Sequence, residues 1–338
     1  MPVWRGTTIR ITLILLVLLA AIGSAYYFFV YRPSRNVPVE AGYVLPSSVQ
    51  VVDTPAEVRI VVGSIKSGER VDILKRTRNW AQIRTSDNLT GWVGNSDLLD
   101  AQTYEGGQKL LRDLVKTPAQ AEGHTSGLVN LHLEPSREAA QLAQLPENLK
   151  VQVFGRRWVD RPPPDGQPSA AKVRDAWYLI RADARAGWVM GRFVALDIPE
   201  KLAPYAQGSN LVAWVVLKTV DDEGQPVPEY LTADRLGTQE ADFSHIRVFT
   251  WWIKDHKYVT AYVEGGLNGY FPIRVAEVNG VPYFRLRLMD GQGQKYQKVY
   301  GLFDTITHAV GTVPGWESDA MPVSPESHHH HRSGRRKG

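Results

Sequence analysis

One pattern of residues occurs twice in the chain, and this repeat constrains the fold more than any other feature. Each copy contains a Trp-x-x-Ile-Arg segment that is followed, ten or eleven residues on, by Gly-Trp-Val. The matching segments are residues 80–84 with 91–93, and residues 177–181 with 187–189. Because a repeated pattern at a fixed spacing marks a repeated structural unit, the sequence predicts two similar modules.

Alternating apolar residues precede the tryptophan segment in both copies, as in half-buried strands. They are Val71 and Ile73 in the first copy, and Val151 and Val153 in the second. With the Trp-x-x-Ile-Arg and Gly-Trp-Val segments, this arrangement resembles the bacterial SH3 domain (SH3b) over roughly residues 42–100 and 126–197. The N-terminal strand of each copy departs from the family pattern.

The resemblance implies a small barrel of five to six strands in each copy. It also implies a place outside the cytoplasmic membrane, where some members of the family bind cell-wall peptides. Other members bind proteins or have no known ligand.

Two segments separate or interrupt the copies. The second copy has extra residues before Trp177, including a proline run at 161–166, which predicts an extended surface loop. Residues 101–125 form a linker in which Leu110, Leu111, Leu114 and Val115 have helical spacing, so one short helix that packs on a barrel is expected.

From about residue 205 to 316 the chain is rich in Val, Tyr, Phe, Trp and Ile, and it predicts an antiparallel β domain of no recognised family. Asn279-Gly280 is a strong hairpin signal, and Asn268-Gly269 marks another expected reversal. Residues 229–236 are interpreted as one or two helical turns. Residues 317–338, with four consecutive histidines at 328–331, are expected to be a disordered tail whose histidines bind metal weakly or belong to a tag.

The N-terminal part contains an uncharged apolar run at residues 11–31. Since a helix needs about 20 residues to cross a bilayer, residues 1–35 are predicted to be an uncleaved membrane anchor. A cleaved signal with its site near Gly23-Ser24-Ala25, or a buried core helix, are the alternatives. The fold class expected for the whole chain is therefore mainly β: two small SH3-like barrels and a C-terminal antiparallel β domain, preceded by one transmembrane helix.

Composition excludes several kinds of chemistry. The chain has no cysteine, so it has no thiol nucleophile and no thiolate metal site. The formal net charge of +4 comes from the two termini, and the part between them is mildly acidic, which gives no case for a nucleic-acid partner. We find no catalytic, metal or cofactor motif, and the chain is predicted not to be an enzyme.

Tryptophans are the candidate binding residues. The four repeat residues are core or rim residues of the barrels, or they line a groove for a peptide or glycan. Trp251 and Trp252 are adjacent in a predicted strand, so one of them should face away from the core. The full candidate set is Trp80, Trp92, Trp177, Trp188, Trp251 and Trp252.

The sequence therefore predicts a single-pass protein of the cell membrane with an extracytoplasmic body. We expect it to act in binding or scaffolding at the cell envelope, with cell-wall peptide or an envelope protein as the partner. The alternative is an envelope enzyme whose site lies in residues 205–316, lined by His245, Asp255, His256 or paired carboxylates. An inert spacer is a third possibility.

Overall fold

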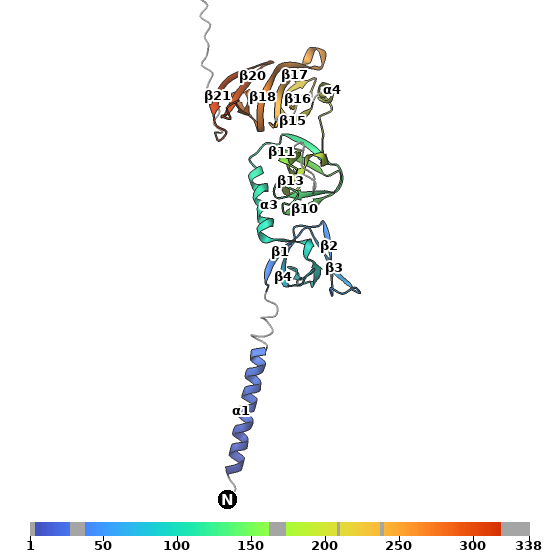
Figure 1. Ribbon diagram of the computed structural model, residues 1–338, viewed down its shortest axis with the longest axis vertical. Helices are drawn as coiled ribbons and strands as arrows, with labels where there is room; N and C mark the ends of the chain where they lie inside the picture. The colour runs from blue at the N-terminus through green and yellow to red at the C-terminus, as the bar shows by residue number, and fades with distance from the viewer. Residues whose placement is uncertain (1–3, 28–37, 162–173, 208–209, 237–239, 319–338) are drawn as a thin grey trace, which may run out of the picture. The chain divides into compact units, whose positions relative to one another are not determined.

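The computed structural model describes residues 4–27, 38–161, 174–207, 210–236 and 240–318 (Figure 1). The chain divides into two compact units, Met1–Glu105 and Gly106–Gly338. The described residues are mainly β, with three antiparallel sheets of seven strands each. The histidine tract and most of the proline loop predicted at 161–166 lie outside the described residues.

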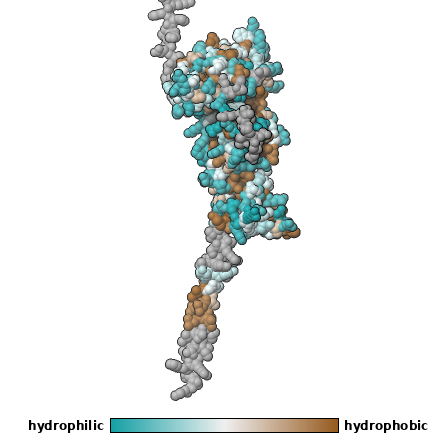
Figure 2. Space-filling view, viewed as in Figure 1, coloured by the Kyte–Doolittle hydropathy of each residue, from teal (hydrophilic) through white to brown (hydrophobic). Residues whose placement is uncertain are grey.

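The N-terminal helix α1 (Trp4–Tyr26) corrects the predicted fold class. The described residues contain no helix that is both long enough and apolar enough to cross a membrane. The predicted transmembrane helix at 11–31 is therefore wrong for the described residues, although the part of α1 that is coloured in Figure 2 is largely hydrophobic.

The first unit contains a sheet with the strand order β3-β2-β6-β5-β4-β1-β7. Its inward residues alternate with outward ones, and the inner set forms a separate core that includes Val51, Ile73 and Ile83. A short turn, η2 (Asn95–Asp97), leads into the last strand. The strands are β1 (Glu40–Val44), β2 (Ser48–Val52), β3 (Val61–Lys66), β4 (Arg70–Arg76), β5 (Trp80–Arg84), β6 (Thr90–Gly94) and β7 (Leu98–Asp100).

Helix α3 (Ala101–Leu114) follows directly. Asp100 caps its first turn, because its carboxylate accepts a hydrogen bond from the backbone N–H of Thr103 at 2.8 Å. Leu110, Leu111 and Leu114 near its end pack with Phe154 in the second unit. Val115 lies beyond the helix and is exposed.

The second unit begins with a sheet whose order, β10-β9-β13-β12-β11-β8-β14, repeats that of the first sheet strand for strand. Two of its strands, β11 and β12, have 11 and 9 residues, whereas their counterparts β4 and β5 have 7 and 5. A turn, η3 (Gly191–Phe193), again precedes the last strand. The strands are β8 (Ala121–Thr125), β9 (Val129–His132), β10 (Gln141–Leu145), β11 (Lys150–Asp160), β12 (Arg174–Ala182), β13 (Arg185–Met190) and β14 (Val194–Leu196).

The third sheet is a meander in which each strand pairs with the next one in the sequence, from β15 to β21. Asn279 and Gly280 both have positive φ and form the expected hairpin turn between β18 and β19. A short helix, α4 (Ala203–Ala206), precedes the sheet, and η4 (Ile253–Asp255) joins two strands. The strands are β15 (Leu211–Asp222), β16 (Gln225–Asp234), β17 (Phe243–Trp252), β18 (Lys257–Val278), β19 (Val281–Met289), β20 (Lys295–Phe303) and β21 (Ile306–Pro314).

Two local predictions for this sheet are wrong. Residues 229–234 are the end of strand β16, not helical turns, and they are buried on both faces, so the alternation typical of a strand is missing. The expected reversal at Asn268-Gly269 does not occur, because β18 continues through it and pairs first with β17 and then with β19.

The second and third sheets share one hydrophobic core. Leu131, Val153 and Ile180 of the second sheet belong to the same buried cluster as Trp214 and Tyr230 of the third.

Gln120, which is fully buried, connects the same two sheets through its polar atoms. Its side chain accepts a hydrogen bond from the N–H of Ile273 at 2.7 Å and donates one to the carbonyl of Ile273 at 3.2 Å. Its backbone bonds to Val153 and Trp214. These bonds tie the second sheet to β15 and β18 of the third.

Candidate functional site

Trp80 and Trp92 lie side by side on the outer face of the first sheet. Trp80 pairs with Gly94, and Gln82 pairs with Trp92, so the two tryptophans are diagonal neighbours with α-carbons about 7–8 Å apart. Both are half-buried, while Ala81 and Val93 between them point into the core. The alternation of the strands thus places two large aromatic rings on one accessible surface.

Charged and apolar groups surround this aromatic face. The guanidinium of Arg59 lies 5.1 Å from the ring centre of Trp80, within the range of a cation–π contact. On both sides of Arg59, Val58 and Ile60 are 89% and 68% exposed, and the tip of this β2–β3 hairpin is brown in Figure 2. Lys75 lies opposite Gln82 on the neighbouring strand.

The corresponding residues of the second sheet, Trp177 and Trp188, have the same diagonal arrangement but are only 3% and 9% exposed. They form a cluster with Met190, against which Val159 and Phe193 pack. The structure therefore places this pair within packed protein.

Trp251 and Trp252, at the end of β17, are in different environments. Trp252 is 45% exposed. Trp251 is half-buried, and its indole N–H donates a hydrogen bond to the carboxylate of Asp222 at 2.8 Å. The same carboxylate contacts Nδ1 of His256 at 2.8 Å, which lowers the pKa of Asp222 and raises the pKa of His256.

The histidines named for an enzyme site are not brought together. His245 lies near the start of β17 and contacts Asp234 at 3.3 Å, whereas His256 follows the end of the strand and contacts Asp222. Seven residues of extended chain from His245 to Trp252 span on the order of 20 Å. Asp255 forms an exposed ion pair with Lys257. Within the described ranges, no three His, Asp or Glu side chains gather as metal ligands.

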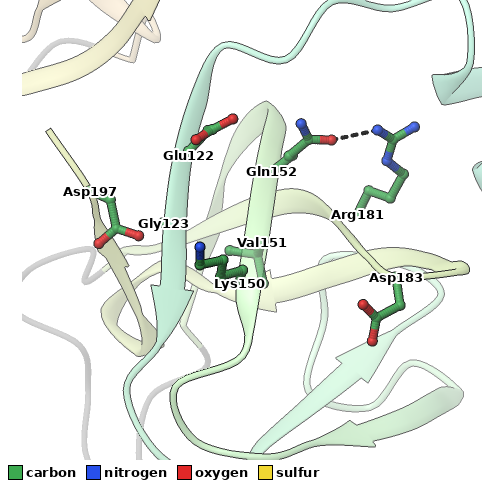
Figure 3. A pocket seen from close by; sticks show the side chains of 8 residues that line it. All are labelled: Glu122, Gly123, Lys150, Val151, Gln152, Arg181, Asp183 and Asp197. Atoms are coloured by element: carbon green, nitrogen blue, oxygen red, sulfur yellow. Dashed lines mark hydrogen bonds between the residues drawn. The ribbon is translucent and has the colours of Figure 1, made fainter. Parts of the chain in front are cut away.

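A polar pocket of about 510 Å³ lies on the second sheet (Figure 3). Its wall contains charges of both signs, and the side chain of Arg181 donates a hydrogen bond to that of Gln152. The other charged lining residues are Glu122, Lys150, Asp183 and Asp197.

A larger pocket of about 700 Å³ lies between the lengthened β11–β12 hairpin and the third sheet. It contains Asp242, which is 6% exposed and accepts a hydrogen bond from the N–H of Phe271 at 2.9 Å. Burial raises the pKa of Asp242 to about 6, although Arg156 and Arg157 oppose this shift. The sequence analysis did not predict this site. A sequence feature that could have indicated it is the run Arg156-Arg157-Trp158, which places two charged side chains and a tryptophan next to one another in a strand.

Residues 61–99 match the family model of the bacterial SH3 domain. No curated protein matches the chain. The similar solved structures include three of low identity. NlpC2 from Trichomonas vaginalis is 10% identical, with a TM-score of 0.17, 70% of this chain and 99% of that chain covered. NlpC1 from the same organism is 11% identical, with a TM-score of 0.17 and 82% and 92% covered. An NlpC/P60 family protein from Bacillus cereus is 9% identical, with a TM-score of 0.22 and 81% and 94% covered.

The family match establishes one bacterial SH3 domain in the first unit. The prediction that the chain is not an enzyme is corrected, because the similar structures include a member of the NlpC/P60 family. Their TM-scores are too low to assign an activity to this chain, and the sequence has no cysteine for a thiol mechanism. The envelope-enzyme alternative therefore stays open, and these structures assign no reaction or catalytic residue to the chain.

Proposed function

We propose that the chain binds the cell wall and that the outer face of the first sheet contacts the peptide of peptidoglycan. The observation that carries this proposal is that the matched segment, residues 61–99, contains both Trp80 and Trp92. Half-buried aromatic rings supply rigid contact area for a ligand. Arg59 and Lys75 supply positive charge beside the rings, where the carboxylates of a wall peptide would interact favourably.

The second sheet is proposed to be a second SH3-like copy. Its strand order repeats that of the first sheet, and its tryptophan pair has the same diagonal register. Since that pair is buried, we assign ligand contact to the first copy and a structural role to the tryptophans of the second. We also propose that the two SH3-like sheets lie outside the cytoplasm, where the cell wall is.

Sedimentation of the full chain with purified peptidoglycan tests the wall-binding proposal. Trp92→Ala should weaken binding by about tenfold or more, as expected for an aromatic residue central to an interface. Trp252→Ala is the matched control, since it removes an exposed tryptophan from the third sheet.

Two outcomes would contradict the proposal. One is equal sedimentation of Trp92→Ala and the unchanged chain, with both folded. The other is no sedimentation at all when a known wall-binding protein is retained. Loss of binding in Trp252→Ala alone would move the contact surface to the third sheet.

An envelope enzyme is the second candidate function. It is favoured by Asp242, because a carboxyl group with a pKa of about 6 in a pocket is suited to proton transfer near neutral pH. Release of soluble fragments from dye-labelled peptidoglycan should then fall by about a hundredfold or more in Asp242→Asn. Absence of release by the unchanged chain would remove this candidate for that substrate.

A further inference from the structure

The outer face of the first sheet contains one carboxylate that binds two cations. The carboxylate of Asp72 in β4 lies 3.3 Å from Nη1 of Arg70 and 3.1 Å from Nη2 of Arg84. Arg70 is two residues from Asp72 in the same strand, and Arg84 is the partner of Asp72 in β5. Because Val71 between Arg70 and Asp72 belongs to the core, all three charged side chains are on the outer face.

The second sheet has cations at the same two positions but a neutral residue between them. In β11, Gln152 takes the place of Asp72 and pairs with Arg181 in β12. Lys150 takes the place of Arg70. Lys150 and Arg181 are therefore diagonal neighbours on one face, with α-carbons about 7–8 Å apart. The second sheet thus keeps the two cations and lacks the carboxylate that binds them in the first.

Neither cation has a carboxylate partner within the described ranges. Arg181 donates one hydrogen bond, to the side chain of Gln152, and its guanidinium lies 5.5 Å from the ring centre of Phe154. Lys150 forms no hydrogen bond or ion pair there. A guanidinium has five N–H donors and an ammonium group has three, so most of this capacity is available to a ligand. A ligand carboxylate could bind both cations, as the carboxylate of Asp72 does in the first sheet.

Acidic side chains line other parts of the same pocket (Figure 3). Glu122 is in β8, opposite Gln152, and Asp183 is in the turn after β12. Neither of these two carboxylates forms an ion pair in the part of the chain that the structure describes. A third carboxylate, that of Asp197, contacts Nδ1 of His124 at 2.7 Å. Three carboxylates and two cations disfavour a ligand that is only an anion, whereas a ligand that also has an ammonium group would interact favourably.

The size and lining of the pocket restrict the ligand further. Its volume of about 510 Å³ is in the range of small-ligand pockets, about 300–1,000 Å³. Among the described residues, no aromatic side chain lines it. Charge, not stacking on a ring, would therefore select the ligand.

We propose that this pocket binds a small zwitterion, an amino acid or a dipeptide with free ends. Its carboxylate lies between Lys150 and Arg181, and its ammonium group lies beside Glu122. The site differs from the tryptophan face of the first sheet in its residues and in its ligand, so it does not depend on whether the first sheet binds the cell wall.

Calorimetric titration of the full chain tests this proposal with three probes. They are alanylalanine with both ends free, its N-acetyl form, which lacks the ammonium group, and its amide, which lacks the carboxylate. The free dipeptide should bind at least about tenfold more tightly than either blocked form, because each blocked form loses one charge-assisted contact. Equal binding of the free dipeptide and either blocked form would overturn the proposal, as would the absence of binding by any probe.

The difference between the two sheets supplies the sharpest variant. Gln152→Asp introduces the carboxylate that Asp72 provides in the first sheet, so it should compete with the ligand for Lys150 and Arg181. It should lower the affinity for the free dipeptide by about tenfold or more. Gln152→Asn shortens the side chain equally without adding a charge, and it should lower the affinity by a much smaller factor. Equal losses in the two variants would overturn the proposal.

Two further variants locate the charged groups of the ligand. Lys150→Gln should lower the affinity for the free dipeptide by about tenfold, and this exposed side chain can be changed with little risk to folding. Lys254→Gln is the matched control, because Lys254 is also an exposed lysine of the second unit without an ion pair in the described chain. Glu122→Gln should reduce the preference for the free dipeptide over its acetylated form. Equal losses in the two lysine variants, or an unchanged preference in Glu122→Gln, would contradict the proposed site.

Discussion

The first and second sheets have the same strand order and the same diagonal pair of tryptophans, yet the two pairs lie in different surroundings. Trp80 and Trp92 remain half-buried on an outer face, whereas Trp177 and Trp188 are enclosed. The cause is the longer β11–β12 hairpin, whose Val159 packs on the enclosed pair and whose Arg157 stacks over Trp188. The same tryptophan motif therefore need not have the same role in both sheets. Strands β11 and β12 are each four residues longer than their counterparts in the first sheet, and the tryptophan pair beside them is buried instead of half-exposed.

The largest effect expected from this comparison concerns stability. Trp188→Ala should lower the free energy of unfolding of the second unit by about 3–5 kcal/mol, because it leaves a cavity in packed protein. Trp92→Ala should cost the first unit less than half as much, since its ring is already partly in contact with water. Urea denaturation of each variant measures its free energy of unfolding. Equal losses in the two variants would mean that the buried Trp188 stabilises its unit no more than the half-buried Trp92 does.

Gln120 provides the next test, because its buried side chain connects the second and third sheets within the second unit. Gln120→Leu should destabilise the second unit by about 2–4 kcal/mol, since the backbone N–H and C=O of Ile273 lose buried partners. Gln82→Ala on the outer face of the first sheet is the control and should change stability by about 0.5 kcal/mol or less. A change of similar size in both variants would contradict the structural role of Gln120.

The smallest of the three effects is a pH dependence expected in the second unit. The folded-state pKa of Asp242 is about 6, above its ordinary value of 3.8, so the folded chain retains this proton more strongly than the unfolded chain does. Its contribution is fully present below about pH 4 and is lost as the pH rises through 6, by at most about 3 kcal/mol. Asp242→Asn should remove this part of the slope in thermal unfolding between pH 4 and 7. An unchanged slope would show that Asp242 titrates normally.

Sequence reasoning could find what depends on local pattern. The alternation of Val71 with Ile73 and the Asn279-Gly280 turn both point to structure that is present, because strand alternation and turn conformation are set by neighbouring residues. The first tryptophan pair also lies within the segment that matches the bacterial SH3 domain, residues 61–99.

What depends on long-range packing could not be read in this way. Residues 229–234 lack the alternation of a half-buried strand because they are buried on both faces. The pocket around Asp242 combines residues about 86 positions apart, such as Arg156 and Asp242, and no local pattern records that distance. The burial of Trp188 likewise depends on packing against Val159, which lies 29 positions earlier in the chain.

The fully bonded Gln120 has a consequence for how such a protein can be rearranged in evolution or by engineering. The first sheet has its own core, so its coding segment could be exchanged or duplicated as a cassette. The second sheet could not be moved in the same way, because excision would uncover the apolar cluster that it shares with β15 and β18 and would break the bonds of Gln120 to Ile273 and Trp214. Recombination boundaries compatible with folding are therefore expected near residue 105, and not between the second and third sheets.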